Sequence, residues 1–189
     1  TGHFLQMEPG VHPDVFINKV TDPREGYRSI PLFYDLIYPV CTPQYLKQNP
    51  EITTLEALRD TVLLNLSPYG RSQIAEHVDW GVWFALHDIN IEERGDDAKH
   101  LFNANDYNML LQMVQNHQGV SLGWNHLVAP LVDAGLLVRL VPQEAVFKEK
   151  CHYLTYEESQ EDNDAFRRLR AWLLDCMDNE ATAIPRRGS

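Results

Sequence analysis

The chain has 189 residues, of which 44% are hydrophobic and 23% are charged, and its formal net charge is −11 at pH 7. A surface that binds DNA or RNA needs concentrated Lys and Arg, because the release of condensed counterions supplies most of its affinity. The balance of 27 acidic against 16 basic residues therefore argues against direct contact with nucleic acid or with an anionic membrane surface. The apolar runs are also shorter than the roughly 20 residues of a membrane-spanning helix.

Cysteine usage is typical of a protein kept in a reducing compartment. Cys41, Cys151 and Cys176 form an odd and widely spaced set without a CxxC pair. A disulfide framework or a zinc site would have an even number of cysteines or paired short spacings. Residues 1–10 do not resemble a signal peptide, so we expect a cytoplasmic protein with buried or idle thiols.

Strand and helix patterns alternate along the chain. The alternating residues 14–20 and the apolar run 31–41 predict strands, and Thr42 followed by a proline predicts a helix start. Later patterns predict the strands 62–66, 100–103, 119–124, 136–141 and 151–156 and the helices 53–58, 72–87, 106–117, 127–134 and 162–178. The helix at residue 53 is predicted from a capping box of Thr53 with Glu56. This alternation with short connections predicts an α/β protein with parallel sheets covered by helices.

The spacing of polar residues does not match a catalytic or metal site. The eight histidines include no HExxH motif and no arrangement of two histidines with an acid. Ser67 and Ser72 lie outside any GxSxG elbow, and Cys151 and His152 would point to opposite faces of a strand. We therefore expect no enzyme, no metal ion and no cofactor.

Several motifs follow one another in an order that resembles one protein family. They are PVCTP at residues 39–43, WGVWF at 80–84, GVSLGW at 119–124 and FRRLRAWLL at 166–174. Together they resemble the effector-binding domain of LysR-type transcriptional regulators over most of the chain. The resemblance implies two Rossmann-like lobes joined by crossing strands, similar to periplasmic-binding proteins of type 2, with a small-molecule effector in the cleft between the lobes.

The resemblance also implies a division of the chain. Lobe I would combine residues 1–41 and 151–182, lobe II would be residues 42–150, and residues 183–189 would form a disordered tail. The family has a strand and a helix before residues 12–17, and another helix and strand between residues 20 and 30. Lobe I is therefore expected to be incomplete here. The family's DNA-reading helix-turn-helix lies outside this chain.

The same resemblance implies effector contacts where strands end in helices. Thr42 follows a crossing strand, so its hydroxyl either contacts an oxygen of the effector or serves only as a helix N-cap. Phe102, Asn103 and Asn105 precede a helix, at a junction that faces the cleft in the family. Capping by Asn105, with Asp106 favouring the helix dipole, explains that junction equally well.

Aromatic residues are the remaining candidates. Trp124 is expected at the cleft, where it forms either a cage for a quaternary ammonium group, with Trp83, Tyr107 and Phe102, or ordinary core packing. The aromatic side chains of residues 80–84 share one helix face, which is expected in the core or against a partner subunit.

We therefore expect the ligand-sensing and dimerisation module of a cytoplasmic bacterial transcription regulator. Its effector would be an organic acid or an amino-acid-like molecule. The protein would form a homodimer or a tetramer, without membrane contact, and would reach DNA only through a helix-turn-helix domain outside this chain. The alternative is a periplasmic solute-binding protein of a transporter, which would share the fold but would require a signal sequence. A third possibility, an α/β enzyme, would require an acid–base pair in the cleft.

Overall fold

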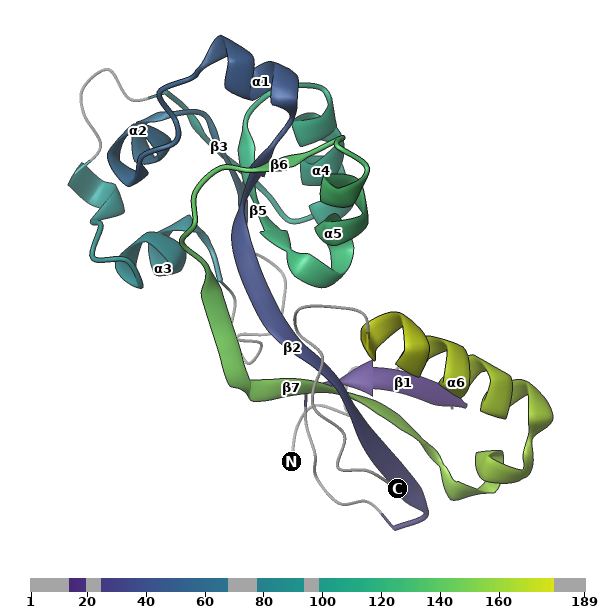
Figure 1. The fold of residues 1–189 in the computed structure, drawn as a ribbon. Helices are drawn as coiled ribbons and strands as arrows, with labels where there is room; N and C mark the ends of the chain where they lie inside the picture. Colours follow the sequence, from purple (N-terminus) through teal and green to yellow (C-terminus); the bar gives the residue numbers. More distant parts are fainter. Residues whose placement is uncertain (1–13, 20–24, 68–77, 94–98, 179–189) are drawn as a thin grey trace. The chain divides into compact units, whose positions relative to one another are not determined.

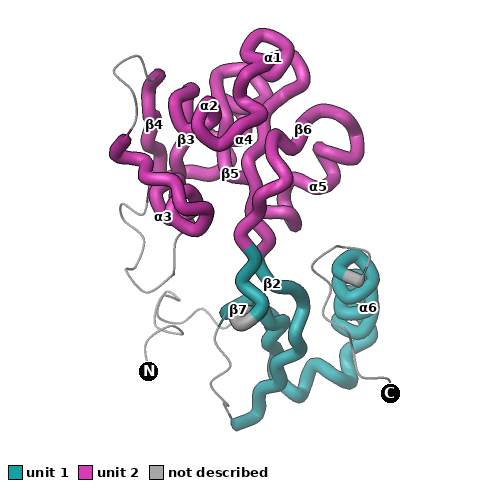
Figure 2. Tube along the Cα trace, turned by 60° about the vertical axis from the view of Figure 1, so that its left-hand side comes forward, with its two compact units in different colours: residues 1–35, 146–189 teal, residues 36–145 magenta. Residues whose placement is uncertain are grey.

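The computed structural model describes residues 14–19, 25–67, 78–93 and 99–178 (Figure 1). The chain divides into two compact units, unit 1 with Thr1–Asp35 and Val146–Ser189 and unit 2 with Leu36–Ala145 (Figure 2). Both β2 (Tyr27–Cys41) and β7 (Ala145–Glu157) contain a unit boundary, so the chain passes from one unit to the other within these strands. The tail expected at residues 183–189 lies outside the described residues. Within those residues, no helix is long and apolar enough to cross a membrane.

Unit 2 is a sheet covered by helices. Its strands are the end of β2, β3 (Leu63–Leu66), β4 (Leu101–Ala104), β5 (Val120–Trp124) and β6 (Val138–Arg139), in the order β2-β5-β3-β4 with β6 beside β2. Its helices are α1 (Pro43–Gln48), α2 (Leu55–Asp60), α3 (Trp80–Ala85), α4 (Tyr107–Gln115) and α5 (Asn125–Asp133), with a 3-10 turn at Ile91–Glu93. The helix expected at 72–87 starts outside the described residues, and the strand expected at 136–141 shortens to β6.

The sheet of unit 2 is mixed, so the prediction of wholly parallel sheets was wrong. Strand β3 runs parallel to β4 and β5, whereas β2 pairs antiparallel with β5 and β6. Helices α1 and α2 lie in the connection from β2 to β3, and β3 begins at the end of the sheet where β2 stops, because both lie beside the start of β5.

Side-chain caps fix where the helices begin. The Thr42 hydroxyl accepts a hydrogen bond from Tyr45 N at 3.2 Å, as predicted for the start of α1. The caps predicted for α2 and α4 were each one residue too early. Thr54, not Thr53, caps α2, and Asp106 caps α4. In each case the residue nearer the helix has the extended backbone that lets its oxygen reach the N–H groups of the first turn.

The core of unit 2 lies on both faces of the sheet. Helices α4 and α5 cover one face, and α3 lies on the other (Figure 1). The buried residues on the α4–α5 side are Leu36, Tyr38, Val40, Leu64, Leu66, Leu110, Val114, Val128 and Leu137. On α3, Trp80, Trp83 and Phe84 are at most 1% exposed, and their rings pack against one another. The aromatic face of residues 80–84 is therefore core within this chain.

Unit 1 is a smaller layer of three strands with one long helix among its described residues. The strand order is β1-β7-β2, with β1 (Val15–Asn18) antiparallel to β7. A 3-10 turn (Glu158–Asp162) leads into helix α6 (Asp164–Asp178). The core beneath α6 consists of Leu32, Phe33, Leu154, Tyr156 and Phe166.

A buried ion cluster accompanies the core of unit 1. The carboxylate of Asp35 accepts hydrogen bonds from Lys19 Nζ at 2.5 Å and from His152 Nε2 at 3.0 Å, and its side chain is only 6% exposed. The His152 ring stacks on Phe33, with 4.5 Å between ring centroids. Burial alone would raise the pKa of Asp35, but the hydrogen bonds from His152 and Lys19 and their charges outweigh it. Together they lower the pKa from 3.8 to about 2.

The cysteines are placed as expected for structural thiols. Cys41 and Cys151 are buried and Cys176 is partly exposed. Burial raises the pKa of the Cys41 thiol to about 12 and also raises that of Cys151. Their thiolate forms are therefore scarce at neutral pH.

Replacing Gly123 should reveal how closely β5 packs on α5. A Cβ added at Gly123 would lie 2.8 Å from Val128 Cγ2 and 3.1 Å from Val40 Cγ2. We expect Gly123→Ala to lower the free energy of unfolding by about 1–3 kcal/mol in urea denaturation. The loss should be smaller when the same change is made in a Val128→Ala background, because the crowding methyl groups are gone. Equal losses in both backgrounds would show that crowding by Val128 is not the cause.

Replacing Asp35 should remove a pH-dependent contribution to stability. The folded-state pKa of about 2 is below the ordinary value of 3.8, so the carboxylate stabilises the fold above pH 3.8 and loses this effect as the pH falls toward 2. For Asp35→Asn we expect a loss of about 2 kcal/mol at neutral pH and a flatter pH dependence below pH 4. Urea unfolding across this pH range measures both, and an unchanged slope would contradict the assignment.

Candidate functional site

The candidate site of unit 2 lies at the edge where its parallel strands end. Strands β3, β4 and β5 run in the same direction, so their carboxyl ends meet at one edge of the sheet. In α/β proteins, ligands bind outside the carboxyl ends of such strands. Four of the predicted site residues lie on or directly after these strands: Phe102 and Asn103 within β4, Asn105 just after it, and Trp124 at the end of β5.

A buried amide supports the site from β3. Asn65 is in register with Asn103, and its Nδ2 donates to Asn103 Oδ1 at 2.8 Å. The other end of the same side chain, Asn65 Oδ1, accepts from Trp80 N at 3.1 Å, at the start of α3. Asn65 is 8% exposed, whereas Asn103 is exposed. Asn103 is thus held through its carbonyl oxygen, and its NH2 group has two N–H donors available for a ligand or water.

Asn105 does not cap helix α4, which was one of its two predicted roles. Asp106 accepts hydrogen bonds from Asn108 N and Met109 N at 2.8 and 3.3 Å, so it supplies the cap of α4. Asn105 is exposed, and its side chain is not engaged by the helix end. Phe102 is 37% exposed and is in register with Leu64. Both side chains are therefore accessible near the end of β4.

Trp124 is the last residue of β5 and lies at the same edge of the sheet. Its ring packs edge-to-face on Tyr107, with 5.2 Å between ring centroids, and it is partly exposed. The Tyr107 hydroxyl donates to Leu122 O at 3.4 Å, and burial raises the pKa of Tyr107. Trp83 cannot complete the predicted aromatic cage, because it is fully buried and its Nε1 donates to Ile37 O at 3.4 Å.

Thr42 lies at the opposite end of the sheet from these residues. Because β2 is antiparallel to β5, the end of β2 lies beside the beginning of β5, where Val40 pairs with Ser121. The Thr42 hydroxyl is 2.6 Å from His117 Nδ1 and also caps α1, and the residue is 4% exposed. The structure therefore does not bring Thr42 together with the other predicted site residues.

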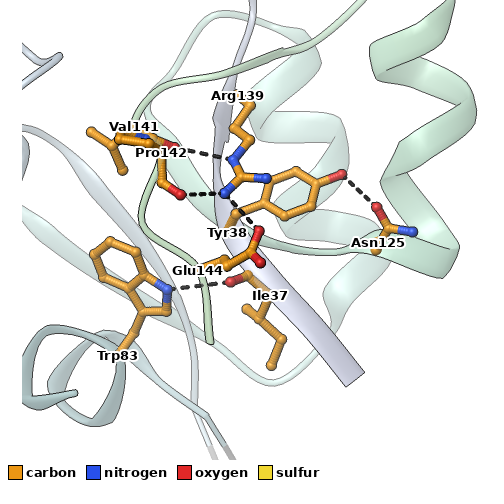
Figure 3. Close-up of polar contacts among 8 residues, drawn as sticks. All are labelled: Ile37, Tyr38, Trp83, Asn125, Arg139, Val141, Pro142 and Glu144. Carbon is orange, nitrogen blue, oxygen red and sulfur yellow. Dashed lines mark hydrogen bonds and ion pairs between the residues drawn. The ribbon is translucent and has the colours of Figure 1, made fainter. Parts of the chain in front are cut away.

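Sequence reasoning missed a second polar cluster, which includes the start of α5 (Figure 3). The Tyr38 hydroxyl donates to Asn125 Oδ1 at 3.0 Å, and the Arg139 guanidinium lies 4.7 Å from the centre of the Tyr38 ring. Arg139 also donates to the carbonyl oxygens of Val141 and Pro142 and pairs with Glu144 at 2.8 Å. These residues come from distant parts of the sequence, and the only local signal was a charged residue inside an apolar strand pattern.

The arrangement is suited to binding by hydrogen bonds and aromatic contact. Amide groups of Asn103 and Asn105 and the rings of Phe102 and Trp124 supply donors, acceptors and apolar surface. Across the described part of the chain, no three His, Cys, Asp or Glu side chains come close enough to hold a metal ion.

Comparison with known proteins identifies a family that shares this fold. Residues 12–178 match the family described as the LysR substrate binding domain. None of the curated proteins searched matches the chain.

Solved structures of regulator domains are similar to the chain at low sequence identity. The effector domain of the transcriptional regulator AmpR of Pseudomonas aeruginosa is 20% identical, with a TM-score of 0.59 over 89% of this chain and 74% of that one. The regulatory domain of CrgA, a LysR-type regulator from Neisseria meningitidis, is 16% identical, with a TM-score of 0.55 over 87% and 75%. The C-terminal domains of a LysR family protein from Agrobacterium tumefaciens are 16% identical, with a TM-score of 0.54 over 90% and 75%. At these identities the likeness shows the fold.

Removing the amide of Asn65 should destabilise unit 2. Asn65→Ala leaves the buried Trp80 N–H without its acceptor and releases Asn103, so we expect a loss of about 1–3 kcal/mol. Asn103→Ala removes only the exposed partner and should cost less. Urea unfolding of the two variants measures the difference, and a larger loss for Asn103→Ala would contradict the supporting role of Asn65.

Proposed function

The chain belongs to the LysR substrate-binding domain family and senses a small-molecule effector within a LysR-type transcription regulator, and from this premise we propose where and what it binds. The effector is an organic acid or an amino-acid-like molecule, and it contacts the carboxyl edge of the unit 2 sheet. We propose Phe102, Asn103, Asn105 and Trp124 as contact residues. Units 1 and 2 correspond in this proposal to lobes I and II of the family.

One observation carries the proposed site. Asn103 is fixed by the buried Asn65 through its carbonyl oxygen, which presents its NH2 group at the strand edge. An N–H donor held in this way binds a carboxylate or carbonyl oxygen without losing much side-chain freedom. Asn105 stands two residues further on and is not used as a helix cap. Thr42 is left out of the proposed site because its hydroxyl already bonds His117 and caps α1 at the other end of the sheet.

Signalling in this proposal consists of a shift between conformations. Effector binding stabilises the conformation for which the effector has the higher affinity. That shift reorients a DNA-binding helix-turn-helix domain outside this chain, and the regulator works in the cytoplasm as a homodimer or tetramer. No bond is made or broken. The family match favours this function over that of a periplasmic solute-binding protein serving a transporter.

A ligand screen by thermal shift tests the proposal. Ligands that bind only the folded protein raise its unfolding midpoint with concentration, so we expect a shift from one member of a panel of carboxylates, amino acids and quaternary amines. Asn103→Ala should reduce the affinity for that ligand by about tenfold, as expected for the loss of one hydrogen bond to a charged group.

A matched control separates binding from folding. Asn116→Ala also removes an exposed asparagine, at the far end of α4, and should leave the affinity unchanged. A quaternary amine as the best ligand would overturn the proposed effector class. A carboxylate that binds Asn103→Ala as tightly as the original chain would overturn the proposed site.

A further inference from the structure

A series of hydrogen bonds runs from the start of α3 to the edge strand β4. It begins at Trp80 N, which donates to Asn65 Oδ1 at 3.1 Å, and continues from Asn65 Nδ2 to Asn103 Oδ1 at 2.8 Å. An amide side chain accepts only at its oxygen and donates only at its nitrogen. Once the first donor is fixed, every later hydrogen bond in the series therefore has one possible direction.

The backbone N–H of Trp80 fixes that direction. It belongs to the first turn of α3, where N–H groups have no acceptor within the helix, and the capping side chain of Asp79 accepts from Val82 N instead. Trp80 is 1% exposed, and its Nε1 donates to Leu64 O at 3.0 Å, so the residue is held in the core. An Asn65 turned the other way would place its NH2 group against this buried N–H, and the N–H would lose its acceptor.

The same constraint turns the exposed amide of Asn103. Asn65 and Asn103 are in register across β3 and β4, and the NH2 group of Asn65 faces the Asn103 carbonyl oxygen. A reversed Asn103 would bring two NH2 groups together, so its own NH2 group points away from Asn65. Within the described residues, that NH2 group has no hydrogen-bond acceptor. The carboxylate of Asp106, three residues further on, accepts from N–H groups of α4.

We infer that Asn65 determines the hydrogen-bond polarity of the effector site. Through Asn65, a backbone N–H of the core selects a ligand group that accepts hydrogen bonds at Asn103, such as a carboxylate, against one that only donates, such as an ammonium or amidinium group. Asn65 does not touch the ligand and is a positioning residue. The inference rests on the proposed function and deepens it, because the carboxylate end of an amino-acid-like effector, and not its ammonium end, then contacts β4.

Asn65→Asp should reverse the polarity with almost no change in side-chain size. The new carboxylate accepts from Trp80 N as before but cannot donate, so Asn103 turns its NH2 group inward and its carbonyl oxygen toward the ligand. The probes are benzoate and benzamidine, which share a ring and carry planar head groups of opposite polarity, titrated by NMR at pH 8. In the original chain, we expect Asn103→Ala to lower the affinity for benzoate about tenfold. In the Asn65→Asp background, Asn103→Ala should instead lower the affinity for benzamidine about tenfold and leave that for benzoate unchanged or higher.

A second buried asparagine controls for the added negative charge. Asn125 is 7% exposed in unit 2, and its Oδ1 accepts from the Tyr38 hydroxyl, so Asn125→Asp adds a buried carboxylate without a contact to Asn103. In this background, Asn103→Ala should still lower the affinity for benzoate about tenfold, because the Asn103 amide has not turned. If Asn103→Ala acts in the same way in the Asn65→Asp and Asn125→Asp backgrounds, Asn65 does not set the polarity and the inference is overturned.

The side-chain amide resonances report the orientation without any ligand. In the original chain, the Asn65 proton that is bonded to Asn103 should exchange with water at least about tenfold more slowly than the two exposed Asn103 protons. In Asn65→Asp, one Asn103 proton should become the slowly exchanging one. Magnetisation transfer from water, measured by NMR, gives these rates. A slowly exchanging Asn103 proton in the original chain would mean that both amides are turned the other way, which overturns the inference.

A variant without added charge keeps the test decisive if circular dichroism shows that Asn65→Asp does not fold. Asn65→Ala lets Asn103 turn either way, so the ratio of benzoate affinity to benzamidine affinity should fall by about fivefold. An unchanged ratio in this variant would overturn the inference.

The outcomes separate this inference from the proposed function. A benzoate affinity that Asn103→Ala does not change in the original chain would overturn the proposed contact at Asn103, and the inference with it. A loss of benzoate affinity on Asn103→Ala, without reversal in Asn65→Asp, would overturn the inference alone and leave the proposed function standing.

Discussion

The buried amide of Asn65 is the interaction on which the candidate site depends. It joins β3 to β4 through Asn103 and to the start of α3 through the backbone of Trp80. Strand β4 is four residues long and its side chains are mostly exposed, so burial contributes little to its position. The hydrogen bond from the buried Asn65 therefore adds to the backbone pairing with β3 in holding β4 in place. The same side chain anchors the aromatic core of α3, so site and core are stabilised by one group.

Much of the fold was predictable because it follows from short-range patterns. Apolar periodicity and capping chemistry indicated the long strand of residues 31–41 and the start of α1 at Thr42. They also grouped Trp80, Trp83 and Phe84 on one helix face, for which the structure selects the core over a partner subunit. The direction of β2 was not predictable from these patterns. It depends on where the connection through α1 and α2 returns to the sheet, which is set by the three-dimensional path of the chain and not by local sequence.

The candidate site was predictable only in part for the same reason. The resemblance to the LysR-type family indicated Phe102, Asn103, Asn105 and Trp124, and they lie near the carboxyl ends of parallel strands, where ligands bind in α/β proteins. Thr42 also ends a strand, but one that runs the other way, which places it at the opposite end of the sheet. Asn65 lies in the middle of an apolar strand, and nothing in its neighbours indicates that its side chain meets Asn103 from 38 residues away. The same holds for Arg139 and Tyr38.

The burial of Cys41 in unit 2 and of Cys151 in unit 1 limits which reagents can react with these two side chains. Oxidants react with thiolates, and both the Cys41 and Cys151 thiols are kept protonated by burial. Peroxide and electrophiles therefore have no ready nucleophile at these two positions. Covalent modification of Cys41 or Cys151 is therefore slow, so both side chains remain thiols that pack in the interior like small apolar groups.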